Sequence, residues 1–181
     1  MSAVNMMLRR MIDTQSIMNV LRTIDDPEMP ISIVDLGLVD DVRIEPAGDT
    51  ARVSIDILPT FVGCPALEMI ADNITEKVGL LDGVSAVDVR FVYDPPWSVD
   101  RITDDGRASL KEHGVTVPES GSRLTVPGHS GGAVELRASA VKCPFCGSDA
   151  TTLESSFGPT RCRMIYYCQS CRNTFERLKR V

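Results

Sequence analysis

The chain has 181 residues, enough for one ordinary domain and a small second one, and its 43% hydrophobic and 24% charged residues are typical of a soluble globular protein. The net charge of −6 is uneven, because residues 1–113 carry 10 Lys and Arg against 20 Asp and Glu, whereas residues 141–181 carry 7 against 3. An acidic front part of this size repels phosphate backbones, which argues against nucleic acid as the main partner.

Membrane insertion and export are not expected. The apolar runs fall well short of the ~20 residues that span a bilayer. The first residues, MSAVNMMLRRMIDTQSIMNVL, contain neither a long apolar block nor a small-residue cleavage site. We therefore expect a cytoplasmic protein, in which clustered cysteines hold metal more often than they form disulfides.

Residues 1–113 have the periodicities of an α+β domain. Ile17, Leu21 and Ile24 share one helical face, and hydrophobic residues then alternate with polar ones on both sides of a turn at 47–49, which predicts a hairpin. The expected order is αββαβα, which suits a two-layer domain. In chain order we expect a helix over 14–24, a hairpin over 37–58, a helix over 64–81, a strand over 84–93 and a helix over 98–114.

The composition changes after the last of these helices. Residues 114–140 are rich in Gly, Pro and Ser and lack an apolar period, which predicts a flexible linker. Ordered structure should resume at VKCPFCGSD. The predicted organisation is a domain over 1–113, a linker over 114–140 and a small ribbon domain over 141–181.

Two Cys-x-x-Cys pairs, with 21 residues between them, stand in this last part of the chain. Each pair aims two thiolates at one point, and together they supply the four sulfurs of a tetrahedral Zn²⁺ site. The residues between the pairs favour a β-ribbon, which the metal would help to fold. An iron–sulfur cluster or a redox dithiol is the alternative, although redox pairs usually occur in a βαβ unit. The predicted zinc ligands are Cys143, Cys146, Cys168 and Cys171.

Cys162 stands six residues before Cys168 and outside the two pairs. Free cysteines are among the most buried residues, which favours a packed apolar side chain here. A role as an additional metal ligand or as a free thiol stays open.

Cys64 stands alone in the front part of the chain and is followed by Pro65. Proline prefers the first position of a helix, so Cys64 is the expected N-cap. At such a position the positive end of the helix dipole favours a thiolate, and Gly63 leaves room for a ligand to approach. The residues point equally to a reactive or metal-binding thiolate and to a small side chain packed under a loop.

Two segments carry a resemblance to a known family. IDDPEMPISIVDLGLV and PTFVGCPALEMI resemble the SufT-like iron–sulfur assembly domain, whose pattern is a helix, a DPE-x-P-type turn, a D-L-G-hydrophobic strand entry and a single Cys at a helix start. This resemblance covers residues 17–98. YDPPW and the cysteine-rich tail, in this order, extend it to the PaaD-type accessory proteins encoded with phenylacetyl-CoA epoxidase.

The resemblance implies a non-catalytic protein that helps to mature an iron–sulfur or iron centre. In the epoxidase system, a reductase subunit with flavin and an iron–sulfur centre supplies electrons to a di-iron oxygenase. The implied partners are these oxygenase and reductase subunits, and a homodimer would offer two Cys64 thiolates to a transient cluster. The alternative is a structural or docking subunit of the oxygenase complex in which Cys64 is inert.

The resemblance also assigns roles to single residues. Cys64 matches the functional cysteine of the SufT-like family, and Cys162 matches a further cysteine of the PaaD-type tail. The four paired cysteines match the two knuckles of the ribbon. The remaining matches are Asp26 and Glu28 in the DPE turn, Asp35 in the D-L-G segment and Thr60 on the loop that leads to the cysteine.

Overall fold

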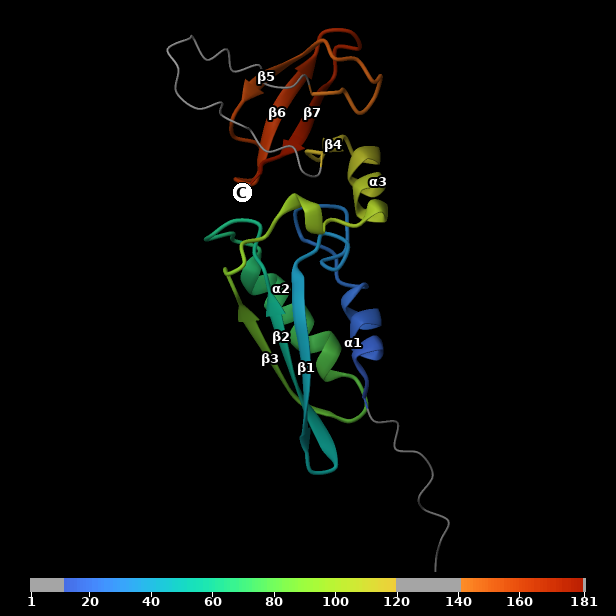
Figure 1. Cartoon of the computed structure of the whole chain (residues 1–181), viewed down its shortest axis with the longest axis vertical. Coiled ribbons are helices and arrows are strands. Elements are labelled where there is room, and N and C mark those ends of the chain that lie inside the picture. The colour runs from blue at the N-terminus through green and yellow to red at the C-terminus, as the bar shows by residue number, and fades with distance from the viewer. Residues whose placement is uncertain (1–11, 120–140, 181) are drawn as a thin grey trace, which may run out of the picture. The chain divides into compact units, whose positions relative to one another are not determined.

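The computed structural model describes residues 12–119 and 141–180, and the chain divides into two compact units, Met1–Trp97 and Ser98–Val181 (Figure 1). Residues 120–140, for which a flexible linker is predicted, lie outside the described residues. Within the described ranges, no helix is both long enough and apolar enough to cross a membrane.

The first unit contains a three-stranded sheet and two helices. α1 (Thr14–Leu21) precedes the hairpin of β1 (Val39–Ala47) and β2 (Thr50–Ile57), and α2 (Leu67–Gly79) connects β2 to β3 (Val84–Phe91). β1 pairs antiparallel with β2 and β3 pairs parallel with it, so β2 is the central strand. The predicted order of helices and strands in this unit is confirmed.

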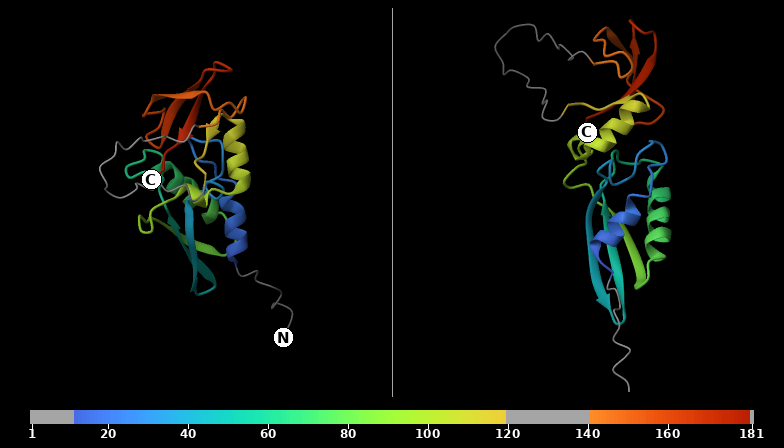
Figure 2. Two further views of the ribbon diagram at one scale, coloured as in Figure 1. Left: turned by 45° about the horizontal axis from the view of Figure 1, so that its top comes forward. Right: turned by 90° about the vertical axis from the view of Figure 1, so that its right-hand side faces the viewer.

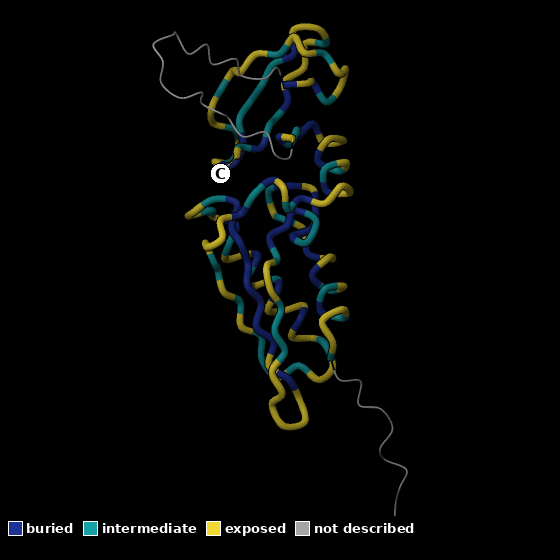
Figure 3. Tube along the Cα trace, viewed as in Figure 1, coloured by how far each residue is buried: buried dark blue, intermediate teal, exposed yellow. Residues whose placement is uncertain are grey.

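The core of the first unit lies between the helices and the sheet (Figure 2). Buried positions follow the central strand β2 (Figure 3). On α2, Ile70, Ile74 and Val78 recur at four-residue spacing and form the buried face. Other fully buried core residues are Ile17, Leu21, Val53, Ile55 and Ile57.

The open face of the sheet is polar and carries a cross-strand ion-pair group. Asp56 in β2 is buried, and its carboxylate accepts hydrogen bonds from Arg43 of β1 at 2.8 Å and from Arg90 of β3 at 3.0 Å. The hydrogen bond to Asp56 is the main cause that raises the pKa of Arg43. One carboxylate thus connects all three strands.

Trp97 connects the segment after β3 to the loop between α1 and β1. Its indole Nε1 donates a hydrogen bond to the carbonyl oxygen of Leu36 at 3.0 Å, and only 2% of the residue is exposed. Leu36 lies in the D-L-G segment and is itself buried. The PPW and D-L-G segments therefore pack against each other.

We expect Trp97→Phe to lower the free energy of unfolding of the first unit by about 1–3 kcal/mol, because the buried Leu36 carbonyl loses its donor. Urea unfolding followed by circular dichroism measures the change. Tyr93→Phe, at an exposed site, is the matched control and should change stability by less than about 0.5 kcal/mol. Equal stability of Trp97→Phe and wild type would contradict the role of this hydrogen bond.

The second unit begins with short helices and ends in a four-stranded sheet. η1 (Val99–Arg101), α3 (Asp104–Glu112) and β4 (Val115–Thr116) come first. The strand order is β4-β7-β6-β5, in which β4 is parallel to β7 and the other neighbours are antiparallel. The predicted β-ribbon is formed by β5 (Thr151–Ser155), β6 (Arg163–Cys168) and β7 (Thr174–Leu178).

The helix predicted over 98–114 is interrupted. Ile102 and Thr103 separate η1 from α3. Thr103 Oγ1 accepts a hydrogen bond from the backbone N–H of Gly106 at 3.0 Å and so caps α3. Gly114 follows the helix with φ of +75°, a conformation that favours glycine, and closes it as expected.

The boundary between the units differs from the one predicted at residue 113. Residues 98–119, which include α3, group with the ribbon, and Val115 and Thr116 pair with Glu176 and Arg177 in β7. A strand of two residues is too short for the alternation that identifies strands in a sequence. The Gly- and Pro-rich composition therefore predicts a linker where the chain already pairs with β7.

Candidate functional site

Four cysteine sulfurs lie close together at the end of the ribbon where β6 ends. Cys143 Sγ lies 3.6 Å from Cys171 Sγ, and Cys146 Sγ lies 3.6 Å from Cys168 Sγ. All four sulfurs lie within 4.8 Å of one another. Tetrahedral zinc with Zn–S bonds of about 2.3 Å places its sulfurs about 3.8 Å apart. The predicted ligands are therefore brought together at a spacing that suits zinc.

Both cysteine pairs lie in tight turns of the same design. The backbone N–H of Gly147 donates to the carbonyl of Cys143, and that of Arg172 donates to the carbonyl of Cys168, each at 2.9 Å. The donor residue is left-handed in both turns, with φ of +73° at Gly147 and +62° at Arg172. The two turns thereby aim their sulfurs at a common centre.

The chemistry of the four sulfurs also fits a divalent cation. A backbone hydrogen bond from Cys171 lowers the pKa of Cys168 to about 6. A backbone hydrogen bond from Ser148 lowers the pKa of Cys146, but desolvation and the neighbouring thiols outweigh it and raise that pKa to about 12. Thiolates this close repel one another, so a cation is needed to keep all four ionised. The site therefore fits a structural zinc held by four thiolates.

The left-handed residue of each turn gives a matched pair of predictions. We expect Gly147→Ala to weaken zinc binding by about fivefold, because a left-handed side-chain residue costs about 1 kcal/mol and nothing else within 4 Å opposes the added Cβ. Arg172→Gly should strengthen binding by up to about fivefold for the same reason. Competition with a chelator measures both. Shifts of the same sign in the two variants would contradict this account.

Cys162 lies away from the four clustered cysteines. Its side chain is buried, and its Sγ lies 3.0 Å from Thr160 Oγ1. The length of β6 separates it from Cys168, about 20 Å at ~3.3 Å per residue. This position suits a packed thiol and does not allow Cys162 to bind the same zinc as the four clustered cysteines.

Cys64 lies half-buried in the loop between β2 and α2. The prediction that it caps α2 is wrong: Pro65 and Ala66 first form a turn, Ala66 is the N-cap, and the helix begins at Leu67. The carbonyl of Cys64, rather than its sulfur, accepts the backbone N–H of Leu67 at 3.4 Å. The preceding residue borders open space, because a Cβ added at Gly63 meets no atom within 4 Å beyond its chain neighbours.

The other residues assigned by resemblance lie in two loops at the same end of the first sheet (Figure 1). The loop over 22–38 precedes β1, and the loop over 58–66 follows β2. The two loops meet where the backbone N–H of Leu58 donates to the carbonyl of Leu38 at 2.8 Å. The acidic residues and Cys64 therefore share one end of the domain.

Two of these residues hold their own loop in shape. Asp26 Oδ1 accepts from the backbone N–H of Glu28 at 2.9 Å, and Asp35 Oδ2 accepts from Ser32 Oγ at 2.7 Å. Thr60 is buried. These contacts give Asp26 and Asp35 a part in the structure of their loop. A part for Asp26, Glu28, Asp35 and Thr60 in handling a cluster stays a prediction.

Exposed apolar side chains flank Cys64 in the sequence. Val62 is 72% exposed, and Met69 in the first turn of α2 is 55% exposed. The sequence analysis missed both residues. The spacing of Ile70 and Ile74 assigns the buried face of α2 and leaves Met69 off it, so periodicity could have identified this exposed position. Both side chains are accessible to another protein.

Two family models match the chain. The one described as an iron–sulfur cluster assembly protein matches residues 14–89, from α1 to β3, and includes Cys64. The one described as a PaaD zinc beta ribbon domain matches residues 128–179 and includes the four clustered cysteines. The predicted resemblance to SufT-like and PaaD-type proteins is confirmed.

Relatives match the same parts of the chain. A protein of Escherichia coli (strain K12), whose name describes it as a component of 1,2-phenylacetyl-CoA epoxidase, is 38% identical over 160 residues, which cover 88% of each chain. Fe-S protein maturation auxiliary factors of Porphyromonas gingivalis and Bacillus subtilis are 30% and 33% identical over 53% of this chain and over 89% and 91% of their own lengths. The chain therefore belongs to the PaaD family, with an iron–sulfur cluster assembly domain followed by a PaaD zinc ribbon.

Proposed function

We propose that this protein is a non-catalytic accessory protein that helps to assemble an iron–sulfur or iron centre of a phenylacetyl-CoA epoxidase. The observation that carries the proposal is the position of Cys64, half-exposed on a loop of the assembly domain next to open space at Gly63. Similarity to an epoxidase component over 88% of the chain supports the epoxidase as the client system. The maturation factors that match the first unit support the activity.

Cys64 handles its cargo with incomplete ligation. A stable cluster usually takes four protein ligands, whereas Cys64 is the one cysteine of residues 1–97. One thiolate holds iron or a cluster weakly enough to release it to a client that supplies the remaining ligands. A homodimer would contribute a second Cys64 thiolate. The iron or cluster is therefore cargo and not a resident cofactor.

In this proposal, the zinc ribbon docks onto the client protein. Zinc with four thiolate ligands has no open position for catalysis, so it acts on structure. Residues 141–181 carry 7 Lys and Arg against 3 Asp and Glu, a positive charge that complements an acidic client surface. The proposed partners are the oxygenase and reductase subunits of the epoxidase system, in the cytoplasm.

A second candidate function is a structural or docking subunit of the oxygenase complex. The exposed apolar side chains of Val62 and Met69 favour it, since they provide a protein contact whether or not Cys64 binds metal. In that case Cys64 would be inert.

Metal analysis separates the two candidates. Wild type and Cys64→Ser are purified without oxygen and reconstituted with iron and sulfide, and zinc, iron and acid-labile sulfide are measured per chain. We expect one zinc in both proteins and iron with sulfide in wild type only. One zinc and no iron in either protein would reject the carrier role and leave the docking subunit.

A further inference from the structure

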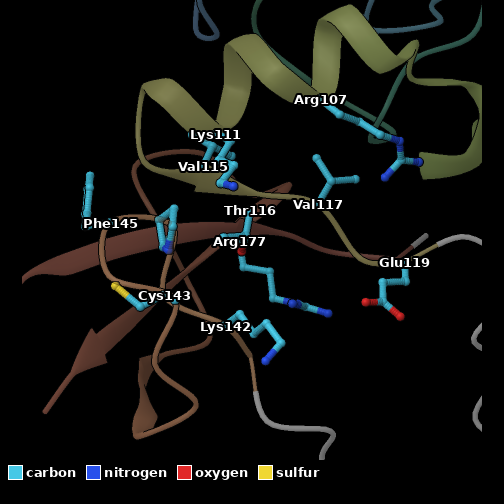
Figure 4. Close-up of a pocket in the computed structure, with 12 residues that line it drawn as sticks. Arg107, Lys111, Val115, Thr116, Val117, Glu119, Lys142, Cys143, Phe145 and Arg177 are labelled. Atoms are coloured by element: carbon cyan, nitrogen blue, oxygen red, sulfur yellow. The ribbon is translucent and has the colours of Figure 1, made fainter. Parts of the chain in front are cut away.

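A cleft of about 640 Å³ lies within the second unit, beside the first zinc knuckle. α3 and the segment over 115–119 form one side, and residues 142–147 with β7 form the other (Figure 4). Its volume lies in the range of small-molecule sites, about 300–1,000 Å³. Neither family match nor the zinc site gives this cleft a role.

The cleft is strongly cationic. Four basic side chains line it against the single carboxylate of Glu119. Arg107 and Lys111 approach it from α3, and Lys142 and Arg177 from the ribbon (Figure 4). The resulting charge of +3 exceeds what one carboxylate group of a ligand neutralises.

Two of these four cations make no hydrogen bond or ion pair within the described residues. Arg107 donates to the carbonyls of Val99 and Pro118, and Lys142 pairs with Asp149 at 3.1 Å. Within the described residues, no hydrogen bond or ion pair engages Lys111 Nζ or the guanidinium of Arg177. Both are therefore available to an incoming anion.

Arg177 is also partly withdrawn from water. Desolvation is the largest cause that lowers its pKa, and the like charge of Arg180 adds to this effect, whereas Tyr166 and Glu119 oppose it. A half-buried guanidinium without a hydrogen-bonded partner is unfavourable unless an anion neutralises it. A bound anionic group would supply that partner.

The remaining walls of the cleft are apolar. Val115 and Val117 line it from the strand side, and Phe145 lines it from the zinc knuckle. Phe145 is 53% exposed. Its ring packs closely against Gly114, where an added Cβ would come 2.8 Å from the ring. The ring thus offers an aromatic face next to the cations.

From this combination we propose that the cleft binds a small organic polyanion, a phosphate ester that carries an apolar or aromatic part. Since Asp149 pairs with Lys142, a charge of +2 is left in the cleft for a compound with two or more phosphate charges, and the apolar walls take the uncharged part. Nucleotides and coenzyme A thioesters share this chemistry. The site does not depend on Cys64, so its test is independent of the proposed carrier role.

Isothermal titration calorimetry on the full zinc-loaded chain tests the proposal with ADP, coenzyme A and hexaglutamate as probes. We expect saturable, salt-sensitive binding of coenzyme A with or without binding of ADP. Binding of coenzyme A alone identifies the coenzyme as the source, and binding of both identifies their shared adenosine phosphate part. Lys111→Gln should weaken binding by about tenfold, since it removes one charge-assisted contact.

Two further variants complete the calorimetric test. Arg52→Gln removes the same charge from an exposed position in the first unit and should leave binding unchanged. Arg177→Gln should weaken binding further, and its zinc content shows whether the ribbon is still folded. Three results would overturn the proposal: no saturable binding of either phosphate ester, equally tight binding of hexaglutamate, or wild-type affinity in Lys111→Gln.

Discussion

Removal of zinc is expected to unfold the ribbon and to leave the first unit folded. The core around the metal is small, with Val141 and Phe175 packed together with three of the four ligands, Cys143, Cys168 and Cys171. A core of this size cannot offset the loss of structural zinc, which supplies on the order of 10 kcal/mol in small zinc domains. The first unit has its own core around Ile55 and Ile70 and does not need the metal.

Hydrogen exchange followed by mass spectrometry measures this result. After chelation, peptides from β6 and β7 should exchange like unfolded chain, while peptides from β2 and α2 keep their protection. Cys143→Ser should reproduce the effect without a chelator. Cys162→Ser should keep its zinc, because Cys162 lies outside the cluster. If β6 stayed protected from hydrogen exchange without zinc, the ribbon would not need the metal to stay folded.

Cys64→Ser is expected to abolish maturation of the epoxidase in cells without unfolding the protein. Replacement of sulfur by a hydroxyl removes the soft ligand that iron and clusters prefer. The folding cost should stay within about 1 kcal/mol, since the residue is half-exposed and does not cap α2. Activity of the phenylacetyl-CoA epoxidase should fall by at least about tenfold, the loss expected when one essential group is removed.

The assay compares epoxidase activity in cells whose own copy of this gene is replaced by wild type or by the variant. Thermal unfolding and zinc content of the purified variant serve as controls for folding. Met69→Ala, at an exposed position near the cysteine, should lower activity without any effect on iron binding in vitro. Full epoxidase activity with Cys64→Ser would reject the carrier role.

The sequence predicts those parts of the structure that have a local signal. Alternation on both sides of Gly48 identifies the hairpin, and the four-residue repeat from Ile70 to Val78 identifies the buried face of α2. The spacing of the cysteine pairs identifies a four-cysteine metal site, and the four sulfurs do lie close together. Each of these signals lies within one element or in a fixed spacing, so it can be read without knowledge of the fold.

Other features depend on contacts between distant segments or on small differences in turn energy. The cap of α2 was misplaced because a proline at the start of a helix and a proline in the preceding turn have the same sequence signature. Lys111 and Arg177 share a cleft although they lie 66 positions apart in the chain, and neither position carries a local signal. Arg172 adopts a left-handed conformation that a sequence normally indicates with glycine.

The pairing of β4 with β7 decides where the ribbon can be cut. A fragment that begins at Val141, the predicted domain boundary, would lack Val115 and Thr116 and would leave one side of β7 without its backbone partner. Unpaired strand edges recruit strands from other molecules. Fragments that begin at Ser98 keep that edge covered, so aggregation of the shorter fragment should reflect its missing strand and not a weakness of the zinc site.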